Sequence, residues 1–281
     1  MEKEHIRDSD LASSDAPRAE QPVPSTLYTE DYFLTACEGY DEFVASEGEQ
    51  LSRRLRAAFA LAAVEPGMQV LDVGCGRGEI LRHCARLGAD AYGIDYALVA
   101  VRLSQDVTRN TTGAPGRTGV AQADAKRLPF PDAHFDRVLM FDVVEHLHPW
   151  ELHEALLEVH RVLAPGGRLI VHTAPNRWYD RYAYPLVRLF RKAIGQGHRY
   201  PANPRAFLVD VNTHVHVNEQ SMLSLRRTLA RAGFRSRVWL DSPPQGRQNP
   251  LLIDALRAAA FRLPPFRWFF EREVFAVASK R

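Results

Sequence analysis

Cysteine, lysine and long apolar stretches are all scarce in this sequence of 281 residues. The three cysteines, Cys37, Cys75 and Cys84, form no C-x-x-C pair, which argues against a disulfide scaffold and against a cysteine zinc cluster. The best candidate for a membrane span, residues 251–270, is interrupted by charged residues and prolines, so we expect no transmembrane segment. The first ten residues, MEKEHIRDSD, do not resemble a signal peptide. We therefore expect a cytoplasmic protein in a reducing compartment.

Only four of the 36 basic residues are lysines, and the charges are distributed unevenly along the chain. Residues 1–160 carry 15 basic and 27 acidic residues, a net charge of −12, whereas residues 161–281 carry 21 basic and 7 acidic residues, a net charge of +14. A basic half of this kind can bind an anionic partner. The excess of arginine is also typical of a GC-rich genome, and we favour this plainer interpretation.

The hydrophobic content of 46% and the charged content of 25% are those of a globular protein. Residues 1–26 are rich in small, acidic and proline residues and predict a disordered tail. The remaining residues, 27–281, are expected to form a single domain. Its first part, residues 27–67, predicts a helical cap outside the main sheet, in which short aromatic and acidic helices precede a helix within residues 48–64.

From residue 68 onward, strand patterns alternate with helix patterns. The expected strands are residues 68–74, 90–95, 118–124, 135–143, 168–174, 234–240 and 273–279. The expected helices are residues 79–87, 97–108 and 149–163, and a later helix that Asn218 caps and Gly233 ends. This alternation predicts an α/β fold, with a mostly parallel sheet covered by helices on both faces.

Two segments interrupt the alternation. Residues 175–217 are long, irregular and rich in aromatic residues and arginine, which predicts an ordered lid rather than a disordered loop. Residues 218–281 contain the last helix and the last two strands, with a second insertion at residues 243–271. The core between the cap and the lid is residues 68–174.

The strongest chemical signal is VLDVGCGRGEI, residues 70–80, at a strand-to-helix turn where open α/β sheets bind ligands. Gly74, Gly76 and Gly78 allow a sharp turn and a close approach of the backbone to a ligand. The dinucleotide fingerprint would need a further glycine where the chain has Glu79, and a glutamate there suits a pyrophosphate poorly. It tolerates a cationic ligand without phosphates, such as S-adenosylmethionine. Asp95, which ends the second strand, can accept hydrogen bonds from both ribose hydroxyls.

Several motifs then follow in order: D-x-G-C-G-x-G, G-I-D-x-A, A-D-A-x-x-L-P-F-P-D-x-x-F-D, E-H-L and L-x-P-G-G-x-L-I. With these motifs the chain resembles the class I S-adenosylmethionine-dependent methyltransferases, and most of all the branch of the ubiquinone- and menaquinone-biosynthesis enzymes. The resemblance implies a seven-stranded Rossmann-like sheet whose last strand is antiparallel. It also implies a set of cofactor-site residues. These are Asp72, Gly74, Gly76, Gly78, Asp95, Tyr96, Asp124 and Ala125.

The segment FDVVEHLHPW, residues 141–150, follows the fourth strand, on the side where the methyl group is expected. In metal-dependent relatives, a Glu-x-x-Glu-His motif and a later histidine hold a divalent ion. Here the corresponding residues are Asp142, Glu145, His146 and His214, with aspartate in place of the first glutamate. The alternative is that His146 or His214 acts as a simple general base, with Glu145 beside it. Both interpretations stay open.

Three classes of function remain. We favour a methyltransferase acting on the oxygen of a small molecule, such as a phenol, a sugar or a glycan intermediate, with an anionic group that the Arg-rich lid can bind. An RNA 2′-O-methyltransferase and a C-methyltransferase of the quinone-biosynthesis type are alternatives. We see no separate RNA-binding module, so a nucleic-acid partner is disfavoured but not excluded. A non-catalytic cofactor-binding protein is the third class, and the intact glycine motif argues against it.

Overall fold

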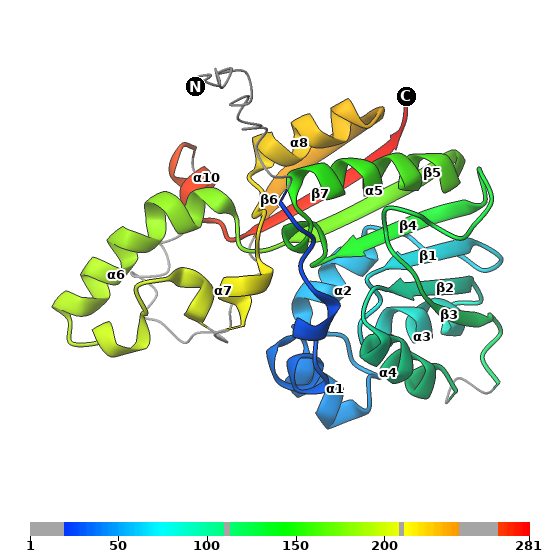
Figure 1. The fold of residues 1–281 in the computed structure, drawn as a ribbon, viewed down its shortest axis with the longest axis horizontal. Helices are drawn as coiled ribbons and strands as arrows, with labels where there is room; N and C mark the ends of the chain where they lie inside the picture. The colour runs from blue at the N-terminus through cyan, green and yellow to red at the C-terminus, as the bar shows by residue number, and fades with distance from the viewer. Residues whose placement is uncertain (1–19, 110–112, 208–210, 242–263) are drawn as a thin grey trace, which may run out of the picture.

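The computed structural model describes residues 20–109, 113–207, 211–241 and 264–281. Seven strands form one sheet in the order β3-β2-β1-β4-β5-β7-β6 (Figure 1). The strands are β1 Gln69–Val73, β2 Asp90–Asp95, β3 Thr118–Gln122, β4 Phe135–Phe141, β5 Leu163–Thr173, β6 Phe234–Asp241 and β7 Glu273–Lys280. β7 runs antiparallel to both β5 and β6, whereas the first five strands pair in parallel. The predicted seven-stranded sheet with an antiparallel last strand is confirmed.

The helices fill the connections between the strands. They are η1 Ser25–Leu27, η2 Tyr32–Ala36, α1 Tyr40–Ser46, α2 Arg53–Ala60, α3 Glu79–Arg86, α4 Leu98–Arg109, η3 Val144–His146, α5 Pro149–Val162, η4 Tyr179–Ala183, α6 Tyr184–Ala193, η5 Gly197–Arg199, η6 Pro204–Phe207, α7 Asn212–Val215, α8 Met222–Arg231 and α10 Phe266–Phe270. One predicted cap is wrong: α8 is capped by Ser221, whose Oγ accepts a hydrogen bond from the Ser224 N–H at 3.1 Å, and not by Asn218. The Asn218 amide instead donates to the Leu147 carbonyl.

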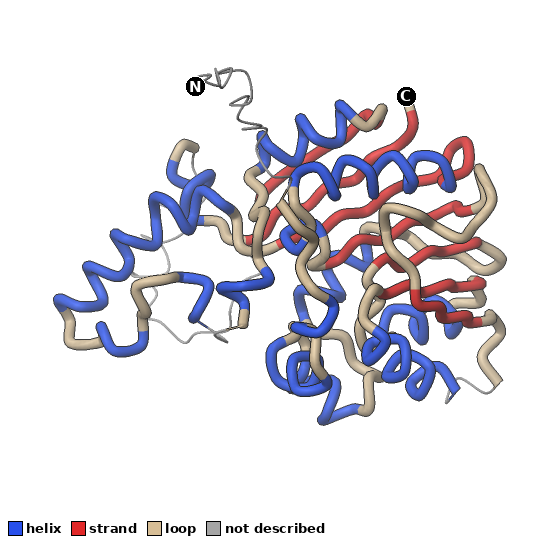
Figure 2. The backbone as a smooth tube through the Cα atoms, viewed as in Figure 1, coloured by secondary structure: helices blue, strands red, loops and turns tan. Residues whose placement is uncertain are grey.

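Alternate side chains of each central strand face opposite sides of the sheet, and each side has its own core. In β4, Val138 and Met140 pack in the cluster that contains the inner faces of α5 and α8, whereas Leu139 and Phe141 pack in the cluster with α2 and α3. Figure 2 shows helices on both faces of the sheet. Both faces of the central strands are therefore buried, which explains their nearly continuous apolar sequences.

The N-terminal segment lies against the domain from Glu20 onward, so the predicted tail of residues 1–26 is wrong for its last seven residues. Val23 is buried in a cluster with Tyr32 and Phe33, and the indole N–H of Trp150 donates to the Glu20 carbonyl. These aromatic and apolar contacts stabilise a stretch whose own composition is polar. Residues 1–19 lie outside the described part of the chain.

Residues 175–207, which we call the arm, extend beyond the sheet edge near β7 and β6 (Figure 1). The arm is largely helical, in contrast to the irregular lid expected for residues 175–217. Its start is held by Asn176, whose side-chain amide donates to the carbonyls of Trp268 and Glu271. Within the described ranges, no helix is long and apolar enough to cross a membrane. Most of the predicted second insertion, up to residue 263, lies outside those ranges.

Candidate active site

The glycine loop follows β1 and requires residues without a side chain. Gly74, Gly76 and Gly78 all have positive φ angles, 75°, 50° and 86°. A Cβ atom on Gly74 would lie 2.5 Å from Cγ2 of Val143, and one on Gly78 would lie 2.9 Å from the Cα of Ser104. Backbone geometry and close packing therefore exclude larger residues at Gly74 and Gly78, whereas at Gly76 only the φ angle disfavours them.

Asp95 fixes this loop from the end of β2. Its two carboxylate oxygens accept hydrogen bonds from the N–H groups of Gly76, at 3.1 Å, and Ala97, at 2.9 Å. Burial raises the pKa of Asp95 to about 6, and these hydrogen bonds oppose the rise. Asp72, buried at the end of β1, has its pKa raised to about 8 by burial and by the nearby Asp95 and Glu79. A cationic ligand at this edge would bring both carboxyl groups back to their charged form.

Glu79 does not face the ligand region as a free carboxylate, which changes one step of the sequence argument. The Arg77 side chain is buried and donates to Glu79 Oε1 from Nε at 3.0 Å and from Nη2 at 2.8 Å. Arg77 also donates to the Phe33 carbonyl at 2.8 Å. The helix start is therefore neutralised locally, and Arg77 joins the loop to the N-terminal cap.

The other predicted cofactor residues lie at the same edge of the sheet. The ring of Tyr96 is exposed, directly after Asp95. Asp124 forms an ion pair with Lys126 at 2.9 Å and accepts a hydrogen bond from the Lys126 N–H, so this carboxylate also stabilises its own turn. Ala125 packs against the core. An adenine amino group at Asp124 would have to share the carboxylate with Lys126.

A second group of polar side chains lies at the end of β4. Glu145 and His146 belong to the short turn η3, and His216 comes from the segment after α7. One ligand atom from each of these three residues lies within 4.8 Å of the others. The segments are joined by the N–H groups of Val217 and Asn218, which both donate to the Glu145 carbonyl.

This grouping differs from the predicted set in two residues. His214 lies on α7 with its side chain exposed, whereas His216, the second histidine of the H-x-H pattern, joins Glu145 and His146. The short helix α7, Asn212–Val215, ends between the two histidines, so that His214 is exposed and His216 lies in the cluster. The sequence alone did not indicate this helix.

Asp142 is also turned away from the predicted site. Its carboxylate pairs with the fully buried His172 at 2.9 Å and with Arg54 at 3.6 Å. Glu273 pairs with the same two residues at 3.4 and 3.6 Å. Burial alone would lower the pKa of His172, but Asp142 and Glu273 outweigh it and raise the pKa to about 9. Asp142 therefore belongs to a charged cluster beneath the site.

Burial also controls the protonation of the three clustered side chains. It lowers the pKa of His146 to about 3, with a further contribution from the neighbouring His216, and lowers the pKa of His216 to about 4. Glu145 is almost completely buried and accepts a hydrogen bond from the Thr173 hydroxyl at 2.8 Å. Burial, together with Asp142, raises the pKa of Glu145 to about 8. At neutral pH both imidazoles are therefore neutral.

Besides His216, sequence reasoning missed a second residue of this site, Tyr28. Its hydroxyl lies 3.2 Å from His146 Nδ1, and the two rings are 5.7 Å apart. Burial raises the pKa of Tyr28 well above its usual value, so the phenol stays protonated. The dense aromatic sequence of residues 27–47 was the available signal, but nothing in it indicated contact with a histidine 118 residues away.

A polar pocket of about 480 Å³ opens beside this cluster. It lies between the arm, the start of α5 and the segment that follows α7. Its lining includes Arg177, Asp180, Arg181, Arg205 and Glu219. Arg205 and Glu219 pair with each other. Arg177 and Arg181 share the wall with Asp180 and Glu20, so the lining carries charges of both signs.

Comparisons with known proteins agree with this architecture. Residues 71–171 match the family described as "Methyltransferase domain". The ubiquinone/menaquinone biosynthesis C-methyltransferase UbiE of Pseudomonas aeruginosa strain LESB58 is 30% identical over 193 residues, which cover 64% of this chain and 70% of that relative.

Two solved structures with this fold have similar coverage. The PH0226 protein from Pyrococcus horikoshii OT3 aligns with a TM-score of 0.56 at 16% identity, over 86% of this chain and 99% of the other. A geranyl diphosphate methyltransferase in complex with S-adenosylmethionine aligns with a TM-score of 0.55 at 19% identity, over 86% and 91%. The chain belongs to the class I S-adenosylmethionine-dependent methyltransferases. Within that class of enzymes it is similar to the ubiquinone- and menaquinone-biosynthesis branch, as the motifs predicted.

Proposed function

We propose that this enzyme transfers the methyl group of S-adenosylmethionine to a hydroxyl-bearing small molecule, and that Glu145, His146 and His216 prepare the acceptor. The observation that carries the proposal is the cluster of these three side chains at the end of β4, next to the glycine loop. Transfer to an oxygen needs loss of the hydroxyl proton, and a neutral imidazole is a suitable acceptor for it. His146 is neutral. To accept the proton at Nε2, its Nδ1 would carry the ring hydrogen and donate it to the Tyr28 hydroxyl, and the substrate would take the place of the ring's contact with the Val215 backbone.

The low pKa of His146 is compatible with this role because it belongs to the site without substrate. A phenolate or alkoxide formed beside the ring is an opposite charge, which favours the protonated imidazole and raises its pKa. Glu145 lies in the same cluster and, when ionised, stabilises the imidazolium further. The remaining task is alignment of the acceptor oxygen with the sulfonium methyl group and exclusion of water.

The residues that would hold the cofactor are the predicted set at the ends of β1, β2 and β3. The glycine loop would approach the ligand closely, Asp95 would accept the ribose hydroxyls, and Asp72 would face the positively charged end of the ligand. The acceptor would occupy the adjoining polar pocket, where Arg177 and Arg181 favour a carboxylate or phosphate group on the substrate. Closure of residues 175–217 over that pocket as a lid stays a prediction.

A ring carbon is the second candidate for the methylated atom. The relative at 30% identity is named a C-methyltransferase, and deprotonation of a hydroquinone makes both its oxygen and the neighbouring ring carbon nucleophilic. The test is incubation with deuteriomethyl-labelled cofactor and separate phenol, hydroquinone, sugar and RNA acceptors. Mass spectrometry detects transfer, and NMR of the product locates the label. Label on a phenol or hydroquinone oxygen supports the proposal, label on carbon selects the second candidate, and transfer to RNA alone contradicts both.

A divalent metal ion is an alternative to the general base. The three side chains offer one carboxylate and two neutral imidazoles, a set that suits Mn²⁺, Fe²⁺ or Zn²⁺. His216 Nδ1 is buried and has no hydrogen-bond partner among the described residues, which is compatible with a missing ligand. An ion held by Glu145, His146 and His216 would lower the pKa of the acceptor hydroxyl. Full activity after dialysis against a chelator would contradict this alternative.

A further inference from the structure

An apolar stripe lies along one side of α6. Leu186, Leu189, Phe190 and Ala193 recur at the spacing of a single helix face, and all four side chains are exposed. The exposed fractions of the three large ones are 62%, 66% and 62%, higher than for most other large apolar residues of the described chain. Amphipathic helices of globular proteins normally turn such a face toward the core, so this stripe indicates an external partner.

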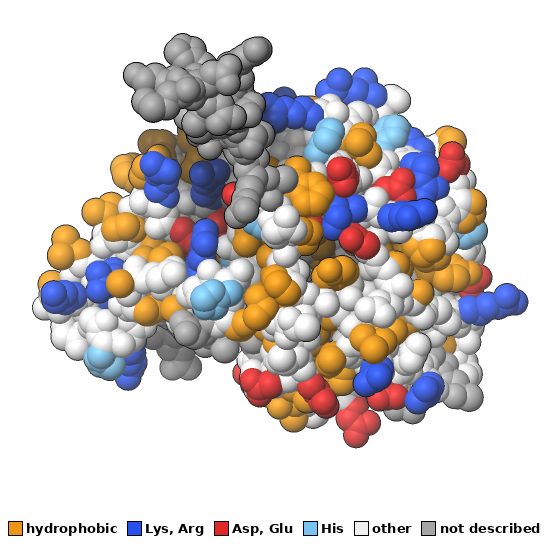
Figure 3. Space-filling model, viewed as in Figure 1, with side chains coloured by type: hydrophobic (Ala, Val, Ile, Leu, Met, Phe, Trp, Pro, Cys, Tyr) orange, Lys and Arg blue, Asp and Glu red, His pale blue; other side chains and the backbone are white. Residues whose placement is uncertain are grey.

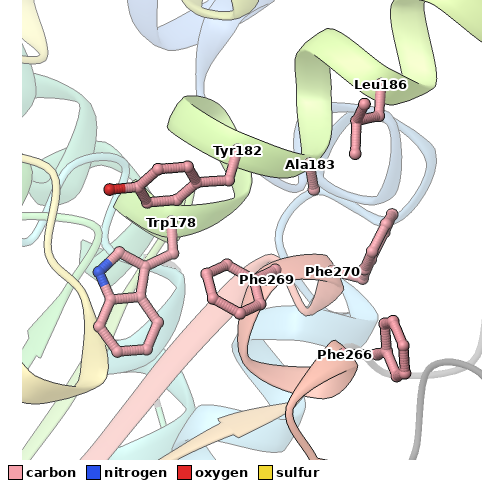
Figure 4. Close-up of a pocket in the computed structure, with 7 residues that line it drawn as sticks. All are labelled: Trp178, Tyr182, Ala183, Leu186, Phe266, Phe269 and Phe270. Atoms are coloured by element: carbon pink, nitrogen blue, oxygen red, sulfur yellow. The ribbon is translucent and has the colours of Figure 1, made fainter.

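The stripe continues onto α10. Phe269 stacks on Trp178 at 5.7 Å and meets the edge of Tyr182 at 5.6 Å, which joins α10 to the start of the arm. Between them lies an apolar hollow of about 580 Å³ (Figure 4). Its lining residues are Trp178, Tyr182, Ala183, Leu186, Phe266, Phe269 and Phe270. Two further aromatic side chains of α10, Phe266 and Trp268, are 55% and 40% exposed.

The charge along α6 and the arm segment that follows it is basic, whereas Asp180 and Glu271 lie at the ends next to η4 and α10. Residues 181–209 contain six basic residues and no aspartate or glutamate. On α6 itself, Arg188 and Lys192 are exposed, and Arg191 lies over the Tyr200 ring at 5.4 Å. Figure 3 shows basic side chains interspersed with hydrophobic ones on the arm. A second copy of the same surface would bring like charges together, whereas an anionic surface would complement them.

We propose that α6 and α10 dock the protein on an anionic lipid bilayer. Leu186, Leu189 and Phe190 would enter the boundary between headgroups and acyl chains, and Arg188 and Lys192 would contact headgroup phosphates. A basic amphipathic helix with bulky apolar residues on its other face is the typical form of an interfacial membrane helix. Exposed aromatic residues such as Trp268 are favoured at the same depth. This proposal does not depend on the identity of the methyl acceptor.

The test is co-sedimentation of the full chain with sucrose-loaded vesicles, at low and high salt. Vesicles of phosphatidylcholine alone are compared with vesicles of equimolar phosphatidylcholine and phosphatidylglycerol. We expect binding to the anionic vesicles only, weakened by salt because the cations are near the surface. The double variant Leu189→Asp/Phe190→Asp should bind at least about tenfold more weakly, since it removes apolar burial and adds negative charge. Its matched control is Leu157→Asp, an exposed leucine on α5, which should bind normally.

A second pair of variants separates charge from apolar contact. Arg188→Gln/Lys192→Gln should reduce binding to anionic vesicles by about 25-fold, because each of the two cations near such a surface contributes roughly fivefold. Arg226→Gln/Arg227→Gln removes two exposed charges from α8 and should have no effect. Thermal unfolding and cofactor affinity, measured for every variant, confirm that each remains folded.

Several outcomes would overturn the proposal. One is the absence of binding by the folded wild-type protein to either vesicle. Another is equal binding to neutral and anionic vesicles, which would remove the role of the cations. A third is a dimer in sedimentation velocity that Leu189→Asp/Phe190→Asp dissociates, without vesicle binding, which would assign the stripe to self-association. Binding that responds equally to the arm variants and to their controls would also contradict it.

Discussion

The part of the sheet that we propose to hold the cofactor (the cofactor edge) and the part that we propose to hold the acceptor (the acceptor edge) are adjacent but are built in different ways. The cofactor edge is formed by short stretches of backbone directly after β1, β2 and β3, and its key contacts, such as Asp95 with the Gly76 N–H, are local to the sheet. The acceptor edge joins η3 to Tyr28, 118 residues earlier, and to His216 of the segment after α7. Substitutions in the N-terminal segment or in the segment after α7 would therefore change the acceptor edge and leave the backbone turns of the cofactor edge intact.

The largest effect is expected at the acceptor edge. His146→Ala should lower kcat by about 10²–10⁴-fold, the range for loss of a general base, while cofactor affinity stays unchanged. His214→Ala, a substitution of an exposed histidine two residues before His216, is the matched control and should retain activity. Steady-state kinetics and calorimetric titration check the two expectations. Equal losses in the two variants would contradict the placement of His146 at the acceptor.

At the cofactor edge, Gly74→Ala should be the most damaging change. The new Cβ would lie 2.5 Å from Val143 and would also strain a φ of 75°, so we expect a loss of about 2–4 kcal/mol in unfolding free energy. Gly67→Ala has a similar φ of 82° but open space around it, and should cost only about 1–2 kcal/mol. Chemical denaturation measures both. Val143→Ala should recover part of the Gly74→Ala loss, and absence of recovery would argue against the clash.

Asp95→Ala should have a smaller, specific effect. Loss of a charge-assisted hydrogen bond to the ribose should weaken S-adenosylmethionine binding by about 1.5–3 kcal/mol. Asp106→Ala removes an exposed carboxylate from α4 and should leave the affinity unchanged. Calorimetric titration of the two purified variants decides the point, and an unchanged dissociation constant for Asp95→Ala would remove it from the cofactor site.

The smallest effect concerns the pH dependence of stability. The pKa of His172 is raised from 6.5 to about 9 in the folded state, so its stabilising charge is fully present below pH 6.5 and is lost as the pH rises toward 9. Wild-type protein should therefore lose more unfolding free energy between these pH values than His172→Gln. The raised pKa of Glu145, about 8, acts in the same direction, and His172 is one of the groups that lower it. Both proteins are therefore compared in a Glu145→Gln background, in which this group no longer titrates. Parallel pH profiles from denaturation would contradict the charged state of His172.

The two edges also differ in how far sequence could predict them. Every strand was predicted to within a few residues except β5, which starts at Leu163 and not near residue 168. The order of glycines and strand-terminal aspartates predicted which residues meet at the carboxyl ends of the strands, because consecutive parallel strands end at the same side of a sheet. That these residues bind the cofactor stays a prediction. The acceptor edge depends on side-chain directions after irregular turns. Asp142 has a φ of 54° and turns toward His172, and no periodicity predicts that direction.

The remaining differences come from tertiary contacts that composition cannot indicate. Residues 20–26 read as a disordered tail because they contain few apolar residues, yet burial of Val23 and the contact of Glu20 with Trp150 hold them in place. Likewise, the sequence interpretation treated Glu79 as an unpaired negative charge. Its partner Arg77 is only two residues away, but the loop conformation that brings the two side chains together cannot be predicted from the sequence. In each case the sequence did not indicate which residue a side chain would contact in the folded protein.

The link made by Arg77 has a consequence for the order of events in turnover. Arg77 lies between the glycine loop and the carbonyl of Phe33, and the same N-terminal segment carries Tyr28 to His146. In the proposed arrangement, departure of the used cofactor would disturb contacts of the segment that also places Tyr28 against His146. Methyl transfer would then be fast, and opening of the N-terminal segment would limit the release of products. The first turnover should therefore appear as a burst before the slower steady rate.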